Sequence, residues 1–125
     1  MKFKKYNANP LNKVVNDCSI RALSLALNKS WDDVLKDLCK IALKLKVNPT
    51  EIKAINEYLK DFEKVGQRVI RGERRLKVDD LSKNKTYILY MANHLTILNK
   101  GVLIDTWDCR NKPIYSYWCI GGINV

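Results

Sequence analysis

Hydrophobic residues recur every three or four positions through the first half of the chain, a period that predicts helices. One face of the first predicted helix carries Ile20, Leu23 and Leu27. Asn16 and Asp17 precede this face, and both residue types cap helix N-termini by accepting hydrogen bonds from free backbone N–H groups. We therefore predict a helix over residues 16–27, with Cys18 in its first turn.

Two further helices follow the same pattern. Ser30 and Asp33 form a variant capping box, and the apolar stripe behind them consists of Val34, Leu38, Ile41 and Leu45. A third helix is predicted to open at Asn48 and Pro49, with Asn48 as the cap and Pro49 in the first turn. Its apolar stripe, Ile52, Ile55 and Leu59, fades near residues 64–66.

The second half of the chain changes to patterns that are typical of strands. We predict strands at residues 67–70, 86–91 and 114–120, and a helical turn at 78–81. Residues 94–98 and 102–107 flank Asn99-Lys100-Gly101, which is a strong hairpin signal. Residues 1–15 are predicted to be extended or irregular. Helices followed by antiparallel strands predict an α+β fold, with N-terminal helices packed on a C-terminal antiparallel sheet.

The length of 125 residues predicts a single domain over residues 1–125 that can bury its own core. Apolar stretches fall well short of the ~20 residues that a transmembrane helix needs. The basic N-terminal segment leads into no apolar signal region. We therefore expect no membrane partner and a cytoplasmic location, where the four cysteines are reduced.

The charge is strongly basic, with 23 Lys and Arg against 13 Asp and Glu. Such a balance admits nucleic acid or another anionic partner. Lysine outnumbers arginine, aromatic residues do not interleave with the basic ones, and no nucleic-acid motif occurs, so a solvated lysine-rich surface is favoured. The cysteines lack the spacing of zinc ligands and only one histidine accompanies them, so no metal site is expected.

Cys18 is the candidate nucleophile. At a helix N-terminus the macrodipole and the free N–H groups favour the thiolate, which is the species that acyl transfer needs. Considered alone, Cys18 is more typical of a small buried residue. His94, the only histidine, opens the first hairpin strand, and a lone histidine is more often structural.

Asp105 lies on the second hairpin strand. A tight loop at residues 99–101 places His94 and Asp105 nearly opposite each other, and cross-strand neighbours lie ~5 Å apart at Cβ. The other interpretation of Asp105 is an acid at a turn or sheet edge. Taken together, the three residues predict a Cys–His–Asp site in which Asp105 orients His94 and stabilises its imidazolium form.

Three short motifs carry a resemblance to a known family. They are Asn-Asp-Cys-Ser-Ile-Arg-Ala at residues 16–22, Asn-His-Leu-Thr at 93–96 and Asp-Thr-Trp-Asp at 105–108. In this order they resemble the papain-like cysteine peptidase superfamily, in particular the peptidase domains of double-glycine bacteriocin exporters and small bacteriophage-encoded relatives. The last motif is similar to the Asn-Ser-Trp-Gly of papain relatives.

The resemblance implies a papain-like fold and assigns roles by position. Cys18 would be the nucleophile, His94 the general base and acid, and Asp105 the orienting group. Papain relatives place a Gln six residues before the Cys, where its side chain helps to form the oxyanion hole. Asn12 stands at that position here, and Asn16 is a second oxyanion candidate.

The predicted function is a cysteine hydrolase that cleaves a peptide, isopeptide or related acyl bond through a thioester, without a metal or organic cofactor. A peptide or protein would be the substrate. Two tryptophans, Trp107 and Trp118, are candidates for lining the substrate groove, although sheet packing is the commoner role of such residues. Other cysteine-based acyl transfers use the same three groups and stay open at this point.

The alternative is a non-catalytic, phage-type binding or inhibitor protein on the same fold. Its basic surface would meet an acidic protein or nucleic acid in a bacterial or phage-infected cell. Fold alone does not establish function, so the reactivity of Cys18 separates the two interpretations.

Overall fold

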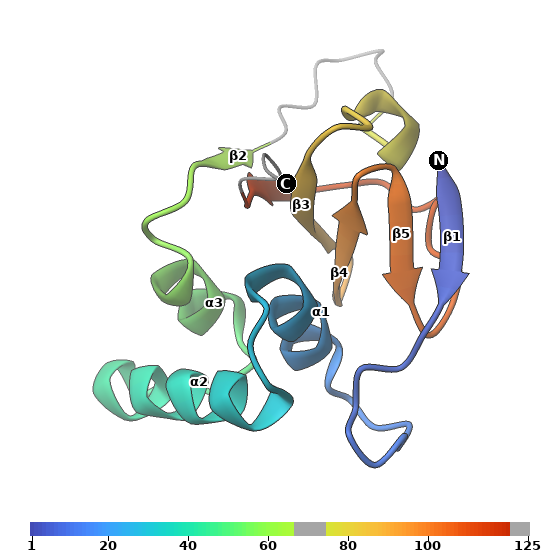
Figure 1. Cartoon of the computed structure of the whole chain (residues 1–125). Coiled ribbons are helices and arrows are strands. Elements are labelled where there is room, and N and C mark those ends of the chain that lie inside the picture. Colours follow the sequence, from blue (N-terminus) through green and yellow to red (C-terminus); the bar gives the residue numbers. More distant parts are fainter. Residues whose placement is uncertain (67–74, 121–125) are drawn as a thin grey trace.

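The computed structural model of the chain describes residues 1–66 and 75–120. Within these residues the fold is α+β, with three helices and a six-stranded mixed sheet (Figure 1). The helices are α1 (Cys18–Leu27), α2 (Trp31–Leu45) and α3 (Ile52–Tyr58), and a 3-10 turn, η1, spans Val78–Asp80. The strands are β1 (Lys2–Lys5), β2 (Lys64–Gly66), β3 (Thr86–Met91), β4 (His94–Asn99), β5 (Val102–Asp105) and β6 (Ser116–Cys119).

The helix starts agree with the capping signals only in part. Ser30 caps α2 as predicted, because its hydroxyl accepts a 3.0 Å hydrogen bond from the Asp33 backbone N–H. Asp17 occupies the N-cap position of α1, but its side chain makes no cap hydrogen bond. The carboxylate of Asp17 is instead bound by other side chains, which are described with the site.

The start of α3 corrects a prediction. Pro49 lies before this helix and not in its first turn, because residues 48–51 form a separate turn in which the Glu51 N–H donates to the Asn48 carbonyl. The buried stripe of α2 is also shorter than expected. Val34 and Leu38 are fully buried, whereas Leu45, at the end of the helix, is 39 % exposed.

The sheet order is β1-β5-β4-β3-β6-β2. The sheet is not purely antiparallel, as the sequence pattern suggested, because β1 pairs in parallel with β5 at its edge. The periodicity of residues 1–15 contains no signal for this pairing, since it depends on a partner about 100 residues away in the chain. The strand predicted at residues 67–70 lies outside the described residues.

The hairpin of β4 and β5 turns through Lys100 and Gly101. Both residues have positive φ, 48° and 84° respectively, as a two-residue type I′ turn requires. Glycine adopts this conformation without steric cost, and the primed turn matches the twist of the paired strands. The turn therefore sets the register of the two strands that carry His94 and Asp105.

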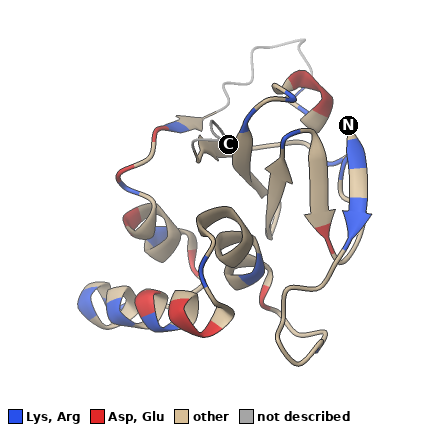
Figure 2. Ribbon diagram, in the orientation of Figure 1, with Lys and Arg blue, Asp and Glu red and all other residues tan. Residues whose placement is uncertain are grey.

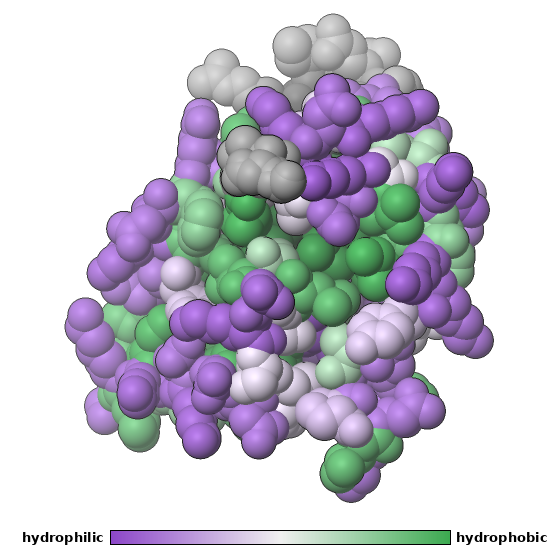
Figure 3. Space-filling view, in the orientation of Figure 1, coloured by the Kyte–Doolittle hydropathy of each residue, from purple (hydrophilic) through white to green (hydrophobic). Residues whose placement is uncertain are grey.

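Hydrophobic side chains form two clusters, one on each face of the sheet. The first joins the helices to the sheet and includes Leu23, Leu38, Ile88, Leu95 and Trp118. The second includes Leu89, Met91, Leu98, Leu103 and Ile114. Apolar side chains reach the surface near the centre of the view in Figure 3 and are surrounded there by hydrophilic ones.

In the described part of the chain, charged residues are spread over several elements (Figure 2). Figure 2 shows Lys and Arg on β1, α2 and several loops, with Asp and Glu interspersed along α2. Among the described residues, no helix is sufficiently long and apolar to cross a bilayer.

Candidate active site

Cys18 is the first residue of α1, and it is half-buried where this helix meets the sheet. Helix α1 packs against β4, the strand that begins at His94. This packing brings the Cys18 thiol beside the His94 imidazole and the Leu95 backbone N–H, so that both lower the pKa of the thiol. Two residues that are 76 positions apart in sequence therefore meet because a helix N-terminus lies against the start of a strand.

His94 and Asp105 are also in direct contact. The His94 Nε2 atom lies 2.7 Å from the Asp105 Oδ2 atom, and both side chains are buried. The strand register differs in detail from the predicted one. Ile97 pairs with Ile104, so Asp105 is diagonal to His94 and not opposite it. Diagonal neighbours remain within reach of a long side chain such as histidine.

The electrostatics of the site favour an ion pair between Cys18 and His94. Burial raises the pKa of the Cys18 thiol, but hydrogen bonds from His94 and the Leu95 backbone, together with the charge of His94, outweigh burial and leave the pKa lowered. Burial lowers the pKa of His94, whereas contacts with Asp105, Cys109 and Cys18 raise it, to about 11. Once the thiol has ionised and while His94 keeps its proton, the pair is thiolate and imidazolium, and it titrates as a unit.

The second oxygen of Asp105 is held by other groups. Asp105 Oδ1 accepts hydrogen bonds from the Thr106 backbone N–H at 2.7 Å and from Arg21 Nη1 at 3.2 Å. Burial raises the pKa of Asp105, but the hydrogen bonds from His94 and from the Thr106 backbone help to lower it below its usual value. Asp105 is therefore a charged acceptor that keeps His94 in one orientation.

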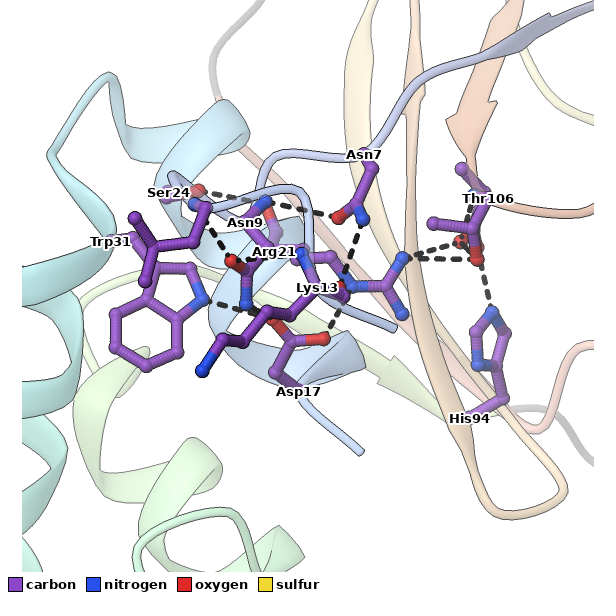
Figure 4. Close-up of polar contacts among 11 residues, drawn as sticks. Asn7, Asn9, Lys13, Asp17, Arg21, Ser24, Trp31, His94 and Thr106 are labelled. Atoms are coloured by element: carbon purple, nitrogen blue, oxygen red, sulfur yellow. Dashed lines mark hydrogen bonds and ion pairs between the residues drawn. The ribbon is translucent and has the colours of Figure 1, made fainter. Parts of the chain in front are cut away.

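Arg21 joins Asp105 to Asp17. Its Nε atom lies 2.8 Å from Asp17 Oδ1, and its side chain is only 11 % exposed. Asp17 Oδ2 in turn accepts hydrogen bonds at 3.0 Å from Asn9 Nδ2 and from Trp31 Nε1 (Figure 4). We call Asn9, Asp17, Arg21, Trp31 and Asp105 the buried polar network.

Sequence patterns alone do not predict this network. The available signal was an acid and an arginine four residues apart, at Asp17 and Arg21, around the start of a helix with no other charged residue. That spacing indicates an ion pair within one helix. The third partner, Asp105, is 84 positions from Arg21 and is visible only in the folded chain.

Cys109 is a further buried residue at the site. Its Sγ atom lies 3.7 Å from Asp105 Oδ2, and the ligand atoms of His94, Asp105 and Cys109 all lie within 4.8 Å of one another. These groups are of the kind that bind zinc. However, His94 and Asp105 already satisfy each other, and the Arg21 guanidinium next to Asp105 opposes a second cation. We interpret the group as a hydrogen-bonded cluster.

One hollow adjoins the Cys18–His94 pair, and a second lies beside Trp107. The first, of about 350 Å³, is lined by Asn16, Cys18, Ser19, Thr50, Glu51, Ile52, Ile55, Tyr90, Asn93, His94 and Leu95. The second, of about 730 Å³, is lined by Lys5, Tyr6, Asn7, Asn12, Val14, Thr106 and Trp107. Of the two oxyanion candidates, Asn16 thus shares a hollow with Cys18, whereas Asn12 lies in the other one.

The two candidate tryptophans have different environments. Trp107 is 43 % exposed, and its ring centroid lies 5.0 Å from that of His94, so it borders the site. Trp118 is 1 % exposed and belongs to the core between the helices and the sheet. A side chain so deeply buried offers no surface to a substrate, so the prediction that Trp118 lines the groove is wrong.

Comparisons of the chain with protein-family models, with curated proteins and with solved structures found no match. The geometry of the site is therefore the basis for the function proposed below.

Proposed function

We propose that the protein is a cysteine hydrolase of the papain-like kind, which cleaves a peptide, isopeptide or related acyl bond. One observation carries this proposal: the Cys18 thiol contacts His94, and His94 Nε2 is held at 2.7 Å by the buried Asp105 carboxylate. Covalent acyl transfer requires a nucleophile next to a base, and an acid that orients the base. The hollow beside Cys18 supplies room for the substrate.

In the first step the Cys18 thiolate attacks the carbonyl carbon of the scissile bond, and the carbonyl oxygen takes up the negative charge. His94 Nε2 is engaged by Asp105, so Nδ1 faces the reaction. As the tetrahedral intermediate collapses, the carbon–nitrogen bond breaks and Nδ1 protonates the leaving amine. The product of this step is a thioester on Cys18.

In the second step, water hydrolyses the thioester. Neutral His94 removes a proton from the water as the water oxygen bonds to the acyl carbon. The carbon–sulfur bond then breaks, the carboxylic acid product leaves, and the thiolate and imidazolium are restored. Candidate donors to the oxyanion are the Cys18 backbone N–H, one of the first four N–H groups of α1, which lack intrahelical acceptors, and the Asn16 side chain in the same hollow. Removing one oxyanion donor typically costs about 10²–10³ in rate.

The rate of Cys18 alkylation by iodoacetamide, measured against pH and resolved by site with mass spectrometry, tests this proposal. We expect Cys18 to react well below pH ~8.5, where ordinary thiols ionise, and faster than the half-buried Cys39 of the same molecule. The advantage is expected to disappear in His94→Ala, because the imidazolium that stabilises the thiolate is removed.

A second measurement separates a hydrolase from a reactive but idle thiol. Incubation with p-nitrophenyl acetate should release p-nitrophenol, acetylate Cys18 and then return the free thiol, whereas Cys18→Ser should show none of these events at that position. A Cys18 that titrates like Cys39 would overturn the proposal and favour the non-catalytic binding protein.

A further inference from the structure

The linings of the two hollows include two neighbouring rings, His94 in the smaller hollow and Trp107 in the larger one. His94 lines the smaller hollow together with Cys18, and Trp107, whose ring lies 5.0 Å from the imidazole, lines the larger one. A substrate whose scissile bond lies at Cys18 would therefore extend into both. An extended peptide advances about 3.3 Å per residue, so side chains close to the bond would enter the hollows.

Besides the Cys18–His94 pair, the smaller hollow holds a negative charge, whereas the protein as a whole is basic. Among the described residues that line it, Glu51 is the only carboxylate, and none is Lys or Arg. The chain as a whole carries a net charge of +10. Ile52, Ile55 and Tyr90 line the same hollow and provide apolar surface on which the methylene groups of a long basic side chain can pack.

Glu51 also has a structural contact. Its Oε2 atom accepts a 3.2 Å hydrogen bond from the Asn48 backbone N–H, in the turn before α3. This contact holds the side chain at the edge of the helix, and Glu51 is only partly exposed. A carboxylate has about four acceptor positions, so this single bond leaves capacity for an ammonium or guanidinium group.

The larger hollow is apolar in character. Three of its residues, Tyr6, Val14 and Trp107, are 48 %, 92 % and 43 % exposed. Lys5 is its only charged residue among those described, so this hollow does not attract a second basic side chain. The two hollows thus have different chemistry and would distinguish the two sides of a substrate.

We infer that the substrate is an extended peptide with a Lys or Arg side chain that pairs with Glu51 on one side of the scissile bond and an apolar side chain against Trp107 on the other. This inference rests on the proposed function, because it places the scissile bond at Cys18. It names the class of substrate for that site.

Charged thiol reagents test the acidic hollow without a known substrate. The second-order rates of Cys18 modification are measured for the cationic trimethylammonioethyl and the anionic sulfonatoethyl methanethiosulfonates. We expect the ratio of the cationic to the anionic rate to fall about two- to fivefold in Glu51→Gln, the range for a partly exposed charge pair. Glu57→Gln is the matched control, because Glu57 lies on α3, the helix that Glu51 precedes, but does not line this hollow.

The apolar hollow is tested with the benzyl and methyl methanethiosulfonates. Their rate ratio at Cys18 should fall in Trp107→Ala and stay unchanged in Glu51→Gln. The inference would be overturned by a ratio of the cationic to the anionic rate that is equal in wild type and Glu51→Gln. It would also be overturned by a ratio of the benzyl to the methyl rate that is unchanged in Trp107→Ala. If Cys18 does not react even with the neutral methyl reagent, both the proposed function and this inference are wrong. If Cys18 reacts but the rate ratios do not change, only the inference about the substrate is wrong.

Discussion

His94 is the residue on which the electrostatics of the site depend. It contacts the Asp105 carboxylate on one side and the Cys18 thiol on the other, and its pKa is raised to about 11. In an unfolded chain the pKa of histidine is about 6.5. Folding therefore favours the charged imidazole. The resulting stabilisation is fully present below about pH 6.5 and is lost as the pH rises through about 11.

The pH dependence of stability tests this assignment. Between about pH 6.5 and 8.5 the lowered pKa of Cys18 contributes in the opposite sense, because the unfolded thiol is still protonated there. Above about pH 8.5 the thiol is ionised in both states, so within the Cys18–His94 pair only the proton of His94 differs. We expect the free energy of unfolding to fall there by up to about 1.4 kcal/mol per pH unit.

The measurement is urea denaturation, followed by circular dichroism, at intervals from pH 8.5 to 11. His94→Gln should show a shallower fall over the same range, because the lysine titrations are common to both proteins. Equal slopes in the two proteins would contradict a raised pKa for His94.

At the scale of elements, helix α1 is anchored by the buried polar network and not by its own N-cap. Arg21, on the second turn of the helix, lies between the carboxylates of Asp17 and Asp105 at 2.8 and 3.2 Å. Trp31 extends the network to α2 through Asp17. The position of Cys18 relative to His94 thus depends on contacts that join two helices, the N-terminal loop and β5.

Arg21→Met tests this role. The variant keeps a side chain of similar length but leaves two buried carboxylates without their cation, and removing one partner of a buried pair typically costs about 3–5 kcal/mol. Urea denaturation at pH 7 measures the loss. Lys29→Met is the control, because Lys29 is 47 % exposed in its pair with Asp37 and such pairs contribute less than about 1 kcal/mol. A loss for Arg21→Met no larger than for the control would show that the network is not an anchor.

At the scale of the whole molecule, the basic residues that the structure describes are spread over several elements (Figure 2). Basic residues of α2, such as Lys36 and Lys40, alternate with acids such as Asp33 and Asp37 on the same helix, and Figure 2 shows this mixture. A nucleic-acid interface normally needs basic residues gathered on one face or along one helix. The net charge therefore predicts solubility and weak attraction to polyanions more than specific binding.

Fluorescence anisotropy with a labelled duplex DNA and a labelled single-stranded RNA measures the affinity of the protein for nucleic acid. We expect weak, sequence-independent affinity at low salt that is lost near 150 mM salt, because non-specific binding depends on counterion release. Cys18→Ser should behave like wild type. Tight binding that persists at physiological salt would contradict this expectation and favour a nucleic-acid-binding function.

Local patterns in the sequence were sufficient to predict much of the fold. They predicted three helices, the strands corresponding to β3, β4, β5 and β6, the hairpin turn at residues 99–101 and the Ser30 cap, since each depends on residues close together in the chain. The same patterns identified Cys18, His94 and Asp105 as candidates. They did so because a cysteine at a helix start and a histidine and an acid on one hairpin are all local features.

The tertiary structure decided what depends on contacts distant in sequence. It placed β1 in parallel beside β5, buried Trp118 in the core and added Arg21, Asp17 and Cys109 to the surroundings of the triad. Residue type and spacing cannot specify these features, because each depends on residues that are distant in the sequence. A buried charge, for example, is stable only beside a partner that the folded chain brings to it. The position of the Cys18 thiol beside His94 also depends on distant residues, because the packing of α1 on β4 brings the two side chains together.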